Sequence, residues 1–246
     1  MHNNPFLDRI FWHALTGAHA RHASGDGGAR RYTAGFSPII AFADSAAPDF
    51  AALAPHCAPG EHFYCENWTG AAPPGWRIDA ETTMFRMVFA GDMPAEDPTP
   101  EALPLQAHHA RQALELATLC KPGPFGIRTI ELGDYFGYFD GERLMAMAGE
   151  RLRAPGLCEI SGVCTHPDYQ GRGLAKQLIG KLIRRHMLRG DTSFLHVMRA
   201  NPAHGVYLRM GFEDYLETVV RVVVREEISV VRCDSHEPPS AMLGRS

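Results

Sequence analysis

The clearest periodic pattern in the chain lies between residues 157 and 189. Up to residue 165 the sequence is a short run with β-branched residues, which predicts a strand, and His166-Pro167-Asp168 is a turn signal. Beyond the turn, apolar residues recur every four positions in one broad stripe: Leu174, Leu178 and Leu182, with Ala175, Ile179, Ile183 and Met187. We therefore predict a strand, a glycine-containing turn and an amphipathic helix that ends at Gly190.

Weaker patterns predict further elements on both sides of this unit. Before it, helices are expected at 8–22, 49–54 and 105–119, and strands at 32–44, 62–65, 82–89, 129–132, 135–139 and 143–150. After it, strands are expected at 194–198 and 219–224, with a short helix at 203–210 between them. Asp140-Gly141 is a strong signal for a two-residue hairpin turn.

This order of elements predicts an α/β protein with a mixed sheet. Four prolines and several acidic residues between 91 and 104 predict a domain boundary. We expect an N-terminal accessory domain at 1–100, a larger domain at 103–230, and a disordered tail at 233–246. The elements of the first hundred residues hint at a degenerate copy of the domain that follows.

Composition narrows the class of protein. The chain has 246 residues, 45% of them hydrophobic, a net charge of -4 and a pI near 6.3, which argues against a nucleic-acid partner. No apolar run is long enough to span a membrane, and the N-terminus shows no secretory signal. The six cysteines have no paired spacing and the thirteen histidines form no zinc pattern. We expect a soluble cytoplasmic protein with reduced thiols and without a metal.

The turn before the long helix carries the first chemical signal. In Gln170-Gly171-Arg172-Gly173-Leu174-Ala175, two glycines allow close backbone approach, and the first helical turn leaves N–H groups without intrahelical partners. Such donors at the positive end of a helix dipole suit a phosphate or a diphosphate. The glycine spacing fits neither a P-loop nor a dinucleotide-binding fingerprint.

The pattern Gln170-x-x-Gly173-x-Ala175 resembles the acyl-coenzyme A signature of the GNAT acyltransferase superfamily. A second stretch, Tyr207-x-x-x-Gly211-Phe212, is similar to a late motif of the same family. Asn201 lies six residues before the tyrosine, where the family usually has seven. The resemblance covers roughly residues 103–225, and it implies a mixed, mostly antiparallel sheet flanked by helices.

The resemblance also implies an activity, the transfer of an acetyl or other acyl group from acetyl-CoA to a primary amine within a ternary complex. It assigns coenzyme binding to Val163, Cys164, Thr165, Gln170, Gly171, Arg172, Gly173, Leu174, Ala175 and Asn201. Tyr207 occupies the position of the general acid that protonates the leaving thiolate. Glu159 lies at the offset of a carboxylate base, with Glu150 or water as alternatives.

Several alternatives remain open at this level. A coenzyme A-binding sensor or interaction module without catalysis would carry the same coenzyme motifs. The acceptor could be a small amine, an amino acid, an aminoglycoside-like compound or a protein lysine. Dimers are frequent in the family, so a homodimer is also open, whereas neither nucleic acid nor membrane is an expected partner.

Overall fold

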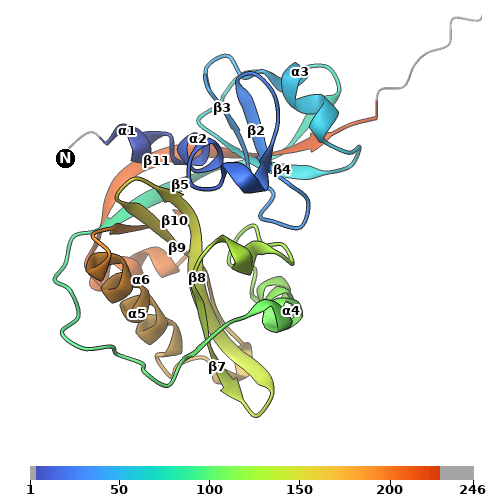
Figure 1. The fold of residues 1–246 in the computed structure, drawn as a ribbon. Coiled ribbons are helices and arrows are strands. Elements are labelled where there is room, and N and C mark those ends of the chain that lie inside the picture. Colours follow the sequence, from blue (N-terminus) through green and yellow to red (C-terminus); the bar gives the residue numbers. More distant parts are fainter. Residues whose placement is uncertain (1–3, 228–246) are drawn as a thin grey trace, which may run out of the picture.

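An eight-stranded sheet organises the computed structural model, which describes residues 4–227 (Figure 1). The strand order is β4-β11-β5-β10-β9-β8-β7-β6. The strands are β4 (His62–Glu66), β5 (Trp76–Phe89), β6 (Leu103–Pro104), β7 (Tyr135–Asp140), β8 (Arg143–Ala154), β9 (Leu157–Thr165), β10 (Thr192–Met198) and β11 (Phe212–Arg225). Only β9 and β10 pair in parallel. The prediction of a mixed, mostly antiparallel sheet is confirmed.

Helices cover both faces of the part of the sheet built by β7 to β10. Helix α5 (Leu174–Leu188) packs on one face and α4 (Ala110–Cys120) on the other, and α6 (Ala203–Arg209) precedes β11 (Figure 1). The predicted stripe on α5 is confirmed, because Leu178, Ile179, Leu182 and Ile183 are at most 2% exposed. The Asp140-Gly141 turn is also confirmed, with Gly141 at a φ of 59° between β7 and β8.

The N-terminal segment does not form a separate copy of this sheet. It begins with α1 (Pro5–Asp8) and α2 (Ile10–Thr16), followed by a small sheet of β1 (Ala23–Ser24), β2 (Ala29–Tyr32) and β3 (Ile40–Phe42), and then α3 (Phe50–Leu53). Strands β4 and β5 then enter the main sheet, where β5 pairs with both β10 and β11. The predicted division into 1–100 and 103–230 therefore cuts across one continuous sheet, and the structure shows no second copy of it among the described residues. The predicted tail at 233–246 lies outside those residues.

Short 3-10 helices connect the larger elements: η1 (Ala20–His22), η2 (Ala54–His56), η3 (Ala107–His109), η4 (Thr129–Leu132) and η5 (Pro167–Tyr169). The prediction of a strand at 129–132 is wrong, because η4 occupies these residues. The amide of Arg128 donates to the carbonyl of Gly35 at 2.7 Å, and Gly126 lies so close to the same carbonyl that a Cβ there would clash. Residues 126–128 thus pack against the N-terminal segment, and this contact holds the chain in a tight turn. The β-branched residues alone had indicated a strand here.

The proline-rich stretch between β5 and β6 runs across α5. The ammonium of Lys181 contacts the carboxylate of Asp97 and donates to the carbonyl of Thr99 at 3.0 Å. Within the described residues no helix has the length and apolarity that crossing a membrane requires.

Candidate active site

Strands β9 and β10 separate in the middle of the sheet. They pair only at Leu157, Cys158 and Glu159 of β9, opposite Thr192, Ser193 and Phe194 of β10. Beyond this point Gly162 adopts a φ of 63°, and the register between β8 and β9 shifts twice. Such bulges bend a strand away from its neighbour. The edge of β9 is thereby left without a partner strand from Ile160 onward.

A cavity of about 460 Å³ lies at this separation. Its walls come from β9, β10, α6, the loop after α4 and the N-terminal segment. They include Ile160, Ser161, Gly162, Val163, Cys164, Thr165, Gln170, Met198, Asn201, Ala203 and Tyr207, with Phe11, Tyr64, Met84, Lys121, Pro124, Arg151, His196 and Val220. The structure therefore brings together six of the residues predicted from sequence: Val163, Cys164, Thr165, Gln170, Asn201 and Tyr207.

The remaining predicted coenzyme-binding residues, 171–175, lie just beyond Gln170 at the start of α5. Gly171 and Gly173 have φ values of 78° and 76°, a conformation that favours glycine, and no side chain caps the helix. The amides of residues 171–176 make no hydrogen bond within the described part of the chain, and the first bonded amide is that of Gln177. The guanidinium of Arg172 lies 4.9 Å from the ring of Tyr169 beside these amides. The start of α5 therefore presents several backbone N–H donors without partners next to the cavity.

Tyr207 faces the cavity from α6, and its ring packs against Phe212 with 6.0 Å between centroids. Burial raises the pKa of its hydroxyl, so the group stays protonated at neutral pH. That hydroxyl makes no hydrogen bond to any residue in the range 4–227. The side-chain oxygen of Asn201 accepts from the backbone amide of Ala203 at 2.9 Å, next to the start of α6, and the side-chain nitrogen Nδ2 has no partner among the described residues.

Glu159 does not have the surroundings of a general base. It is fully buried, and its carboxylate accepts two hydrogen bonds from Arg151 (2.9 and 2.6 Å), one from His196 (2.8 Å) and one from the amide of Leu152 (3.1 Å). Burial opposes ionisation, but the charge and hydrogen bonds of Arg151, and then His196, lower the pKa of Glu159 to about 2. Neither of its oxygens is free to accept a proton from an amine, so the structure does not support the base role predicted from sequence.

Glu159 is instead part of a series of charged and polar side chains that are hydrogen-bonded to one another across the sheet. Glu66 of β4 pairs with Arg86 of β5, and Arg86 donates to Nε2 of His196 at 2.9 Å. His196 must then carry its proton on Nδ1, which donates to Glu159. Arg151 of β8 ends the series at the cavity.

Sequence reasoning missed Arg151 and His196, although one signal was present for the first. Arg151 and Glu159 stand four residues on either side of Pro155, the centre of a predicted turn between two apolar strands. Opposite charges at equal distances from a hairpin turn tend to lie close together. Nothing in the sequence around His196 distinguishes it from an ordinary residue of a buried strand.

The comparisons with known proteins agree with this arrangement. A family model described as FR47-like protein matches residues 135–222, which run from β7 into β11. A solved structure described as an acetyltransferase from the GNAT family, from Novosphingobium aromaticivorans DSM 12444, matches with a TM-score of 0.81 and 31% identity. The match covers 92% of this chain and all of that one. The chain belongs to the GNAT family.

Two more distant structures share the GNAT fold. A GCN5-related N-acetyltransferase from Kribbella flavida matches with a TM-score of 0.57 at 16% identity, covering 92% of this chain and 98% of that one. A GCN5-related N-acetyltransferase-like protein from Streptococcus suis 89/1591 has the same TM-score at 15% identity, covering 87% and 92%. No curated protein matches the sequence. The GNAT assignment supports acyl transfer as the general class of chemistry.

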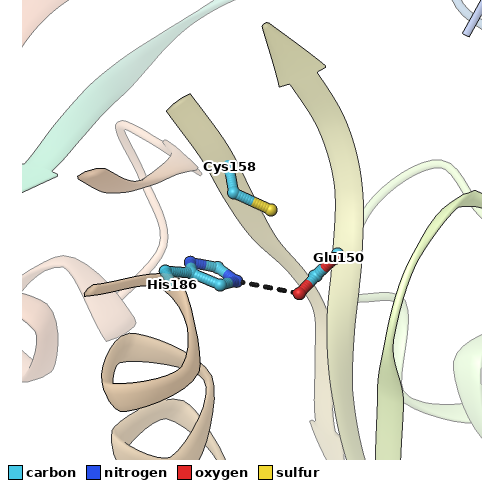
Figure 2. Close-up of side chains that lie close together, drawn as sticks. All are labelled: Glu150, Cys158 and His186. Carbon is cyan, nitrogen blue, oxygen red and sulfur yellow. Dashed lines mark hydrogen bonds and ion pairs between the residues drawn. The ribbon is translucent and has the colours of Figure 1, made fainter. Parts of the chain in front are cut away.

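A second buried polar cluster lies away from the GNAT cavity, where Glu150 of β8, Cys158 of β9 and His186 of α5 point toward one another (Figure 2). Glu150 accepts from Arg189 at 2.6 Å and lies 3.2 Å from Nε2 of His186, while Ser193 bonds the other ring nitrogen. Burial opposes ionisation, yet the hydrogen bonds from His186 and Arg189 lower the pKa of Glu150 to about 2.

The polar atoms of Glu150 and His186 therefore have hydrogen-bond partners, as expected for a buried network that stabilises the fold. The three side chains are of types that bind metal ions, but the guanidinium of Arg189 contacts two of them, Glu150 at 2.6 Å and the sulfur of Cys158 at 3.8 Å, so a positive charge already lies beside them. Glu150 does not line the GNAT cavity, so the alternative base named from sequence is also remote from the chemistry.

The buried histidines and carboxylates make the GNAT fold sensitive to acid. Burial lowers the pKa of His196 and of His19 from 6.5 to about 4. The unfolded chain then binds these protons first, so stability falls as the pH drops from 6.5 toward 4. Glu159 and Glu150, with pKa values of about 2 in the folded chain, add a second loss between 4.5 and 2.

We expect the melting temperature to decrease steadily between pH 7 and pH 4.5, as measured by differential scanning calorimetry. His196 and His19 are both expected to contribute to this slope, since burial lowers the pKa of each imidazole from 6.5 to about 4. A melting temperature that stays constant over this range would contradict the assignment of neutral, buried histidines.

Proposed function

We propose that the chain transfers an acyl group, acetyl in the simplest case, from acyl-coenzyme A to a primary amine by direct attack in a ternary complex. The proposal rests on two features that lie next to each other in the structure. Unbonded amides at residues 171–176 adjoin a cavity that opens where β9 and β10 separate. Together they suit a molecule with a diphosphate at one end and a long amide-containing arm.

Each part of the coenzyme has a matching group in this proposal. The diphosphate binds the amides of Gly171 to Ala175, with Arg172 beside it. The pantetheine arm pairs like an additional strand with the backbone of Val163, Cys164 and Thr165, along the edge that β10 leaves, and Asn201 donates to it from the opposite wall. An amide of Val163 or Cys164 then stabilises the oxyanion that forms at the thioester carbonyl.

Tyr207 is the proposed general acid. Its hydroxyl is protonated at neutral pH and faces the cavity without a hydrogen-bond partner among the described residues, so it is available to protonate the departing thiolate. The base is water in this proposal, because Glu159 and Glu150 are both held by arginines away from the cavity. The attacking amine therefore enters with its proton already lost or loses it to solvent.

The test is release of free coenzyme A thiol from acetyl-CoA in the presence of a panel of primary amines. Amine-dependent thiol release, with a stoichiometric N-acetyl product identified by mass spectrometry, supports the proposal. Tight binding of acetyl-CoA without transfer to any amine would instead favour a non-catalytic sensor, for which the absence of a carboxylate base in the cavity is the supporting observation.

A further inference from the structure

Part of the cavity lining is not used by the proposed coenzyme groups, and we call this part the acceptor pocket. Its walls are Phe11, Tyr64, Met84, Met198 and Val220, together with Arg151. The five apolar and aromatic residues pack in a single hydrophobic cluster, although α2, β4, β5, β10 and β11 supply one each. The acceptor pocket thus offers a continuous apolar surface against which a hydrophobic side chain can pack.

The charges around the cavity have one sign. Among the described residues, no aspartate or glutamate lines it, and its charged side chains are Arg151 and Lys121. A cationic group that entered would lose its hydration without gaining a free counter-charge, because the nearby carboxylate of Glu159 is already paired with Arg151 and His196, and this loss is costly. Polyamines and lysine side chains, which must bring a strongly basic nitrogen to the thioester, are poorly matched to this lining.

Arg151 has donors left over for a ligand. Its Nε and one proton of Nη2 bind Glu159, which uses one side of the planar guanidinium. Its Nη1 makes only a long contact of 3.5 Å, to the carbonyl of Pro124. The side chain is 7% exposed and lines the cavity, so the free side of the guanidinium is held in a fixed position at the cavity wall. A guanidinium held in this way suits a planar anion such as a carboxylate, which it can bind through two parallel hydrogen bonds.

We propose that the acceptor is an α-amino acid with a hydrophobic side chain, bound through its carboxylate by Arg151 and through its side chain by the wall of Phe11, Tyr64 and Met84. The inference rests on the proposed function and names the substrate class of the same site. The deprotonated α-amine forms a bond to the thioester carbon, and the C–S bond breaks. Tyr207 protonates the thiolate, and the proton that the attacking nitrogen loses passes through water and restores the Tyr207 hydroxyl, giving an N-acyl amino acid and free coenzyme A.

The experiment compares three kinds of acceptor with acetyl-CoA as donor, and each kcat/KM is expressed per deprotonated amine because amidation also lowers the pKa of the α-amine. L-phenylalanine and L-leucine carry both recognised groups, L-phenylalaninamide lacks the carboxylate charge, and a lysine-containing peptide with a blocked N-terminus offers only a cationic amine. We expect kcat/KM for phenylalanine to exceed that for its amide by roughly ten- to a hundredfold, because a charged hydrogen-bonded pair is lost. The blocked peptide should be the poorest acceptor.

Arg151 is then tested with the paired variant Arg151→Gln/Glu159→Gln, which removes both members of the ion pair and leaves no buried charge unpaired. The ratio of kcat/KM between phenylalanine and its amide should fall toward one. Calorimetric binding of coenzyme A shows that the variant is folded. In the wild type, calorimetric binding of L-phenylalanine in the presence of coenzyme A provides a readout that does not depend on turnover.

The outcomes separate the acceptor class from the proposed function. Equal rates with phenylalanine and its amide, or a preference for the blocked lysine peptide, would overturn the acceptor proposal and leave acyl transfer intact. A strong preference for succinyl-CoA over acetyl-CoA that disappears in the paired variant would assign Arg151 to a carboxylate on the acyl group, which also overturns the acceptor proposal. Transfer to no amine, despite coenzyme binding, would overturn both.

Discussion

Replacing Tyr207 by phenylalanine is expected to lower kcat roughly 10²–10⁴-fold, the usual contribution of a positioned general acid. The hydroxyl is the only group removed, and it makes no hydrogen bond within residues 4–227, so the fold should be undisturbed. KM for acetyl-CoA should change little, because the lost interaction acts on the leaving thiolate in the transition state. Steady-state kinetics of thiol release measure both constants.

Tyr215 provides a matched control for this variant. It lies on β11, outside the cavity, and its hydroxyl bonds Asp8 at 2.6 Å. Tyr215→Phe should lower the melting temperature slightly and leave kcat within a factor of about two. If Tyr207→Phe retained the wild-type kcat, the role of Tyr207 would be to pack against Phe212, and the thiolate would take its proton from another source.

Replacing Glu159 by alanine should destabilise the protein by about 3–5 kcal/mol, because it leaves the charge of Arg151 buried without a partner. Arg151 and Glu159 are both almost completely excluded from solvent, and the pair anchors the series of charged and polar side chains that crosses the sheet. For a chain of this size, such a loss corresponds to a decrease of roughly 6–20 °C in melting temperature. Thermal or urea unfolding measures it directly.

The paired variant Arg151→Gln/Glu159→Gln is the control, and it should recover most of the lost stability because both charges are gone. This pattern separates the two roles considered for Glu159. A general base would give a stable Glu159→Ala protein with a large defect in kcat, and that result would contradict the role of Glu159 as the fixed partner of Arg151.

The features that sequence predicted well are those encoded by neighbouring residues. The stripe on α5, the Asp140-Gly141 turn and the glycines before α5 are local patterns, and the GNAT fold followed from two short motifs in the right order. The insertion of β5 between β10 and β11 was not predictable in the same way. It depends on pairing between residues more than a hundred positions apart, which hydrophobic periodicity does not record.

The candidate site shows the same limit. Motif positions predicted the proposed coenzyme-binding residues, because these are backbone amides and side chains on consecutive elements. The proposed acceptor pocket includes Phe11, Tyr64 and Met84, which belong to the first hundred residues, where the sequence carried no motif. Glu159 was assigned from its position along β9 alone, and the sequence did not show that Arg151 would take up its carboxylate.

The most direct test of the central claim is a calorimetric titration of coenzyme A into three proteins. Gly173→Asp places a carboxylate beside the amides of residues 171–176, in a left-handed position where a Cβ meets nothing within 4 Å. Gly190→Asp makes the same change at an equally open left-handed position at the other end of α5. We predict one-to-one binding for the wild type and for Gly190→Asp, and at least a tenfold weaker affinity for Gly173→Asp, since an anion there opposes the diphosphate. Absence of binding to the wild type, or equal affinities for all three proteins, would contradict the claim that these amides hold the coenzyme.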